Sequence, residues 1–147
     1  MSYKNLDEEV LVSIYKNARI ALQSIADIIG EAHEESMKEE LRYEHDGYED
    51  FIAKLSAYMK ETGVEEKNIN VFQKAFMFTS IKMNTLTDDS KSHIAELMIK
   101  GTVMGITELT ELINSDGKNI GEKVRAFAEE LRDIDRKSTR LNSSHTT

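Results

Sequence analysis

Two pairs of histidine and glutamate residues are the clearest candidates for chemistry in this sequence. Glu44 and His45 are adjacent, and His93 precedes Glu96 by three residues, a spacing that places both side chains on one face of a helix. Imidazole and carboxylate groups are suitable ligands for iron or manganese. The four residues therefore predict a mononuclear or reduced metal site. The alternative, which we favour, is that they are solvated side chains on acidic helices and that the protein has no cofactor.

Other catalytic motifs are missing from the sequence. A dinuclear metal site in a helical bundle needs inward carboxylates on two helices and a Glu-x-x-His turn on each of two others, and the chain has no Glu-x-x-His. It also has no cysteine, no Gly-x-Ser-x-Gly and no glycine-rich phosphate loop. We therefore expect a protein that is not an enzyme.

An apolar segment around residues 71–78 is the best candidate for an interaction surface. Phe72 and Phe76 share one face of a helix, while Met77 and Phe78 project from other sides. Exposed aromatic and methionine side chains are typical of association surfaces. Phe72, Phe76, Met77 and Phe78 thus predict a homodimer or a protein partner, and the alternative is burial beneath the last helix.

The elements that must position these residues are helices. The chain has no proline, and apolar residues recur at three- and four-residue steps. Helices are predicted over residues 5–30, 34–62, 71–86 and 90–114, followed by a shorter amphipathic piece at 120–131. Because each helix has one apolar stripe to bury, we expect an all-α fold, an antiparallel four-helix bundle with a partial fifth helix.

The fourth predicted helix contains two glycines with a structural meaning. Gly101 and Gly105 are four residues apart and share a face, which predicts close packing of a neighbouring backbone. We expect both glycines and Met104 to face the core.

Composition limits the class of protein and its partners. The 147 residues suffice for one domain, and 39% hydrophobic content is too high for a disordered chain. The net charge of −8 argues against a nucleic-acid or anionic-membrane surface. The N-terminus lacks the apolar run of a signal peptide, and no stretch approaches the roughly 18 apolar residues of a membrane span, so we expect a cytoplasmic protein.

One set of motifs resembles a known family. Phe76-x-x-x-Ser80-Ile81-Lys82, then Leu86-Thr87-Asp88-Asp89 and Ile94-x-Glu96-x-x-x-x-Gly101, resemble the second half of small ferritin-like, rubrerythrin-related bacterial proteins of unknown function. The resemblance covers residues 8–114 in helix order and length. It implies a ferritin-like bundle in a superfamily where some members bind iron. We expect a non-enzymatic protein acting through protein–protein or self-association, and the alternative is a rubrerythrin-like redox or stress protein that binds iron or manganese.

The C-terminal residues have a different character. Residues 135–145, DRKSTRLNSSH, resemble the translated read-through of a sequencing-library adapter, whose codons encode these residues in order. This resemblance predicts a single domain over residues 1–134 and a non-native, disordered tail over residues 135–147. We expect removal of residues 136–147 to leave folding unchanged.

Overall fold

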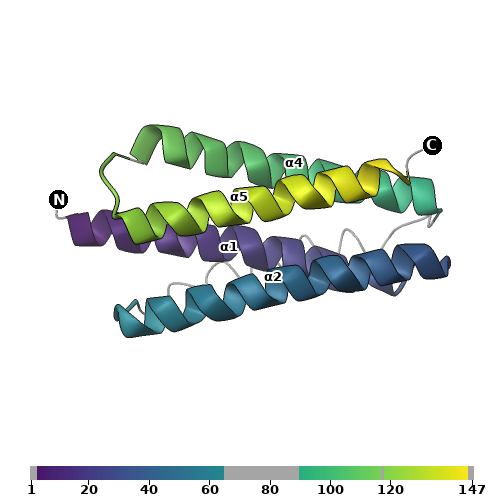
Figure 1. Ribbon diagram of the computed structural model, residues 1–147, viewed down its shortest axis with the longest axis horizontal. Helices are drawn as coiled ribbons and strands as arrows, with labels where there is room; N and C mark the ends of the chain where they lie inside the picture. The colour runs from purple at the N-terminus through teal and green to yellow at the C-terminus, as the bar shows by residue number, and fades with distance from the viewer. Residues whose placement is uncertain (1–2, 65–89, 117, 146–147) are drawn as a thin grey trace.

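The computed structural model describes residues 3–64, 90–116 and 118–145. All regular structure in these ranges is helical, which confirms the predicted all-α class. The helices are α1 (Tyr3–Ile29), α2 (Glu35–Glu61), α4 (Lys91–Asp116) and α5 (Glu122–Ser143), and they lie side by side along one long axis (Figure 1). The helix predicted over residues 71–86 lies outside the described residues.

The helices form two hairpins that pack on each other. α1 packs against α2 and α4 against α5, while α1 also contacts α4 and α5 (Figure 1). α4 begins beside the turn between α1 and α2, where Lys91 Nζ lies 3.3 Å from Glu34 Oε2. The backbone N–H of Gly121 donates a hydrogen bond to Asp7 Oδ1 (2.9 Å), so the start of α5 is held to the start of α1.

The core is built from the predicted apolar stripes, most clearly on α2. The predicted residues of this stripe are all buried: Met37, Leu41, Tyr48, Phe51, Ile52, Leu55 and Met59. The Phe51 ring packs edge-on against Phe127 of α5, with 6.1 Å between the ring centroids. Each buried apolar side chain stabilises the fold in proportion to the area removed from water, about 25 cal/mol per Å².

The prediction of which α4 residues face the core is partly wrong. Gly101 is exposed and Met104 is 65% exposed, whereas Thr102 occupies a buried position. The physical reason is that α4 is apolar on more than one side, because Val103, Met104 and Ile106 follow one another around the helix. Periodicity alone does not select one face of such a helix.

The predicted disordered tail is also wrong for residues 135–143, which continue α5. The buried stripe of α5 begins with apolar residues and ends with polar ones: Val124, Phe127, Ala128, Leu131, Asp135, Ser138 and Asn142. Beyond the helix, His145 Nε2 lies 3.0 Å from Glu40 Oε2 of α2. The helical spacing of inward positions thus continues past residue 134, although the side chains there are no longer apolar.

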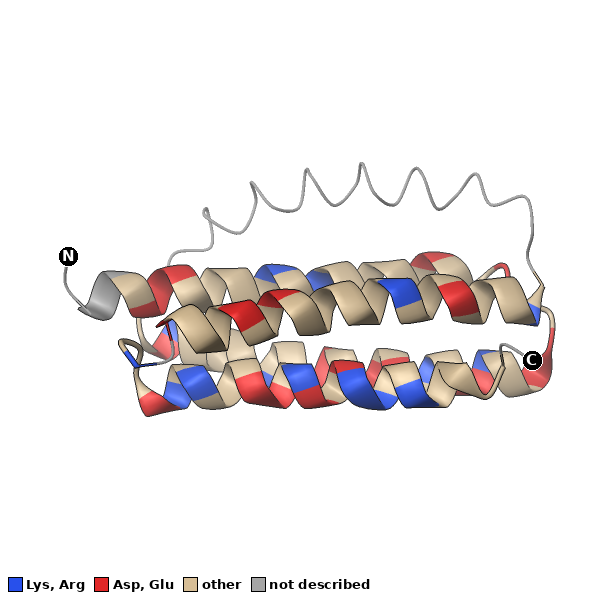
Figure 2. Cartoon of the chain, turned by 90° about the horizontal axis from the view of Figure 1, so that it is seen from above, with Lys and Arg blue, Asp and Glu red and all other residues tan. Residues whose placement is uncertain are grey.

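Acidic and basic residues are interspersed along the described helices (Figure 2). Among the described residues, no helix combines the length and the apolar character needed to cross a membrane.

Candidate functional site

A cluster of five buried polar side chains joins α2 to α5. The Tyr48 hydroxyl donates a hydrogen bond to Asp135 Oδ1 at 2.5 Å. Glu44 Oε1 accepts hydrogen bonds from the Ser138 hydroxyl and from Asn142 Nδ2, the latter at 2.9 Å. All five side chains are buried, and we call them the α2–α5 polar cluster.

Burial controls the protonation of this cluster. Loss of solvation raises the pKa of Glu44 to about 7, although the hydrogen bonds from Ser138 and Asn142 lower it. Burial likewise raises the pKa of Asp135 to about 7 against the lowering effect of the Tyr48 hydrogen bond. Glu44 Oε2 and Asp135 Oδ2 are buried without a hydrogen-bond partner among the described residues. An unpaired oxygen of this kind disfavours the charged carboxylate, so both groups retain protons close to neutral pH.

The two halves of the polar cluster come from distant parts of the sequence. Asp135, Ser138 and Asn142 all lie in residues 135–145, whose sequence resembles adapter read-through. Glu44 and Tyr48 precede that segment.

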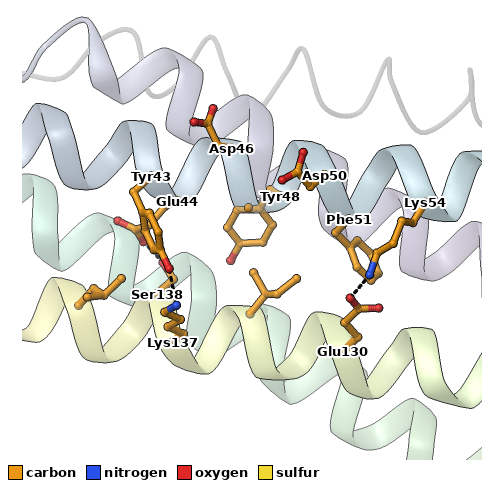
Figure 3. A pocket seen from close by; sticks show the side chains of 13 residues that line it. Tyr43, Glu44, Asp46, Tyr48, Asp50, Phe51, Lys54, Glu130, Lys137 and Ser138 are labelled. Carbon is orange, nitrogen blue, oxygen red and sulfur yellow. Dashed lines mark hydrogen bonds and ion pairs between the residues drawn. The ribbon is translucent and has the colours of Figure 1, made fainter.

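A hollow of about 330 Å³ lies between α2 and α5, and we call it the α2–α5 hollow (Figure 3). Two contacts cross it, an ion pair of Lys54 with Glu130 and a hydrogen bond of Lys137 with the Tyr43 hydroxyl. Lys137 Nζ also lies 4.8 Å from the centroid of the Tyr43 ring. Glu44 and Tyr48 point from α2 towards α5 in this view (Figure 3). The contacts from α2 to α5 hold the walls of this hollow together.

A second hollow, of about 340 Å³, lies between α1 and α4, and we call it the α1–α4 hollow. Its walls are mostly apolar and include Ile20, Ala21, Leu97, Met98, Gly101 and Met104. Its polar end is formed by Asn17, Glu108 and Asp135. Asn17 Nδ2 donates hydrogen bonds to Glu108 Oε2 (3.2 Å) and to the carbonyl oxygen of Gly105 (3.4 Å). Such a surface suits an apolar occupant rather than a charged one.

The predicted close approach at the two glycines of α4 is found at one of them. A Cβ atom on Gly105 would lie 2.7 Å from Asp135 Oδ2 and 3.2 Å from Asn17 Oδ1. A Cβ atom on Gly101 would meet nothing within 4 Å. Of these two glycines, only Gly105 therefore allows side chains of neighbouring helices to approach closely.

The predicted metal ligands lie in separate surroundings. Glu44 belongs to the α2–α5 polar cluster, and His45 Nδ1 lies 3.8 Å from Asp46 Oδ1. His93 Nδ1 lies 3.8 Å from Glu96 Oε2 at the start of α4. Across the described ranges, no three histidine, cysteine, aspartate or glutamate side chains form a group that could hold a metal ion. The structure therefore does not gather the four predicted ligands around one ion.

The predicted interaction surface of Phe72, Phe76, Met77 and Phe78 lies outside the described residues. Within them, sequence reasoning missed an exposed apolar pair on α4, Val103 and Met104. The signal for this pair was present, because apolar residues surround this part of α4 on more than one side.

Comparison with models of known protein families, with curated proteins and with solved structures finds no significant match for this chain. The ferritin-like resemblance thus depends on the motif residues of the sequence.

Proposed function

We propose that this protein acts by self-association, through an apolar ridge formed by Val103 and Met104 on α4, and that it is not an enzyme. The carrying observation is the exposure of these two neighbouring side chains, 46% for Val103 and 65% for Met104. Burying exposed apolar area stabilises a complex by about 25 cal/mol per Å². Association across the ridge would remove both side chains from water.

A second copy of the chain suits this ridge better than a highly charged partner. Two α4 helices meeting about a two-fold axis would bring each ridge against its counterpart, the usual geometry of a homodimer. Gly101 lies one turn before Met104 and has open space at its Cβ position, which lets another backbone approach.

Electrostatics also favours the ridge as the contact. Each copy carries a net charge of −8, so two copies repel each other over most of their surfaces. Val103 and Met104 carry no charge, and repulsion between two copies is weakest where uncharged side chains meet.

The bundle that carries the ridge is proposed to be ferritin-like, with antiparallel neighbours. The two helix hairpins and the motif resemblance support this arrangement (Figure 1). The alternative function, iron or manganese binding by Glu44, His45, His93 and Glu96, has no supporting geometry among the described residues.

Light scattering on the unmodified protein and on two single-residue variants tests the proposal. The unmodified chain is expected to be a dimer, and Val103→Glu is expected to be a monomer because it places a charge on the ridge. Tyr43→Glu is the matched control, since Tyr43 is 56% exposed on α2, and it is expected to remain a dimer. A monomeric unmodified chain, or equal masses for the two variants, would contradict the proposal.

A further inference from the structure

We propose that two copies of the chain pair their α4 helices antiparallel, so that Lys100 of each copy faces Glu108 and Glu111 of the other. The inference rests on the proposed self-association and adds the orientation of the two copies. It follows from the order of the charged residues along the exposed face of α4.

The exposed face of α4 extends beyond the apolar ridge in both directions. Each of its flanking residues lies three, four or seven positions from Met104 and so shares the face of that residue. These exposed residues are Lys100, Gly101, Thr107, Glu108 and Glu111. A second copy that covers the ridge must therefore also meet these neighbours.

Charges on this face are sorted by sign along the helix. Lys100 lies one turn before Met104, and Glu108 and Glu111 lie about one and two turns after it. At a rise of about 1.5 Å per residue, Lys100 and Glu108 are each displaced by about 6 Å from Met104, in opposite directions. The face is thus basic on one side of the ridge and acidic on the other.

A parallel pair of α4 helices would bring like charges together. When the two-fold axis runs along the helices, each residue meets its own counterpart in the second copy. Lys100 would then face Lys100, and each glutamate would face the same glutamate. Like charges opposed across an interface disfavour association.

An antiparallel pair brings opposite charges together instead. When the two-fold axis is perpendicular to the helices, a residue before Met104 meets a residue after it. Lys100 of each copy then meets Glu108 and Glu111 of the other, and symmetry forms this contact twice. The apolar ridge lies near the middle of the face and can be covered in either orientation, so the charges select the antiparallel one.

The acidic side of the face can accept these contacts. Glu108 Oε2 accepts a hydrogen bond from Asn17 Nδ2 at 3.2 Å, and a carboxylate has further acceptor positions for a lysine. Glu111 is exposed one turn further along α4. Attraction at both ends of the interface would offset part of the repulsion between two copies that each carry a net charge of −8.

Charge reversal on α4 tests this orientation, with the dimer dissociation constant measured by sedimentation at low salt. One variant carries Lys100→Glu, a second carries Glu108→Lys and Glu111→Lys, and a third, the exchange variant, carries all three substitutions. The matched control carries Glu49→Lys and Asp50→Lys, at two exposed acidic positions of α2. Circular dichroism of each variant checks that the chain remains folded.

The second variant discriminates most sharply. Replacing two glutamates by lysines makes each copy less negative, so general repulsion between the copies falls, as it does in the control. Antiparallel pairing predicts the opposite result, because the introduced lysines would face Lys100 of the other copy. The dissociation constant should therefore rise by about tenfold for this variant and for Lys100→Glu, but not for the control.

The exchange variant restores opposite charges across the interface and should return the dissociation constant to within about threefold of the unmodified value. It also lacks the hydrogen bond between Asn17 and Glu108, so its recovery would come from the exchanged charges. A second variant that dimerises as tightly as the control, or an exchange variant as weak as the other two, would overturn the antiparallel orientation while the unmodified dimer upholds self-association. A monomeric unmodified chain would overturn both proposals.

Discussion

The two hollows of this bundle have nearly equal volumes, about 330 Å³ between α2 and α5 and about 340 Å³ between α1 and α4. Their chemistry is different. The α2–α5 hollow is bridged by charged side chains and adjoins the buried Glu44, whereas the α1–α4 hollow has apolar walls and adjoins the exposed Met104. The α2–α5 side thus buries Glu44 beneath charged contacts, whereas the α1–α4 side is mostly apolar and leaves Met104 exposed. Exposed apolar surface is therefore available for association on the α1–α4 side, which carries the proposed self-association.

The polar side owes its character to the second half of α5. The first half buries Val124, Phe127 and Leu131, while the continuation buries Asp135, Ser138 and Asn142. Burial of carboxyl groups without full hydrogen bonding opposes folding.

The largest difference in the free energy of unfolding is expected between two side-chain truncations, one at the α2–α5 hollow and one at the α1–α4 hollow. Phe51 is 1% exposed and packs against Phe127, so Phe51→Ala should lower the free energy of unfolding by about 3–5 kcal/mol. Met104→Ala should change it by about 0.5 kcal/mol or less, because Met104 is 65% exposed. Denaturant unfolding of both variants measures the difference, and similar losses would remove the contrast between the two hollows.

A second effect is expected from pH. Because the pKa of Glu44 and that of Asp135 are raised to about 7, the folded state binds more protons than the unfolded state between about pH 4.5 and pH 7. Stability should therefore fall as pH rises through this range. Glu44→Gln should flatten this dependence, and Glu49→Gln, at an exposed position of the same helix, should not. Stability that rises over this range would show that the cluster is not buried as described.

The smallest effect is expected from the two glycines of α4. Gly101→Ala should stabilise the protein by about 0.5–1 kcal/mol, because alanine favours a helix and the Cβ position is open. Gly105→Ala should destabilise it by about 1 kcal/mol or more, because its Cβ would lie 2.7 Å from Asp135 Oδ2. Thermal unfolding of the two variants should show shifts of opposite sign. Two equal shifts would mean that the close approach at Gly105 relaxes freely.

The sequence predicted α2 well because its apolar residues define one face. It did not predict that Glu44, which lies between Leu41 and Tyr48 on this face, is buried, because a charged residue is ordinarily exposed unless tertiary partners enclose it. For α4, apolar residues on several sides left the choice of face to tertiary packing, so the exposure of Val103 and Met104 was not predicted.

The candidate sites were predictable only in part. Glu44 was selected from its residue type, but its partners Ser138 and Asn142 are far from it in sequence and lie in a segment predicted to be disordered. Asn17 gave no sequence signal, since a single asparagine in an apolar helix becomes informative only beside Glu108 and Gly105. Contacts between distant helices are set by packing, which periodicity does not encode.

The most direct test of the central claim is the reactivity of a single thiol placed on the α4 ridge. The chain has no cysteine, so Val103→Cys and the control Tyr43→Cys each carry one thiol at an exposed position. The rate of modification by a soluble thiol reagent is measured as the protein concentration is raised. Self-association through α4 predicts that modification of Val103→Cys slows with concentration while that of Tyr43→Cys stays constant. A rate for Val103→Cys that does not change with concentration would contradict the account.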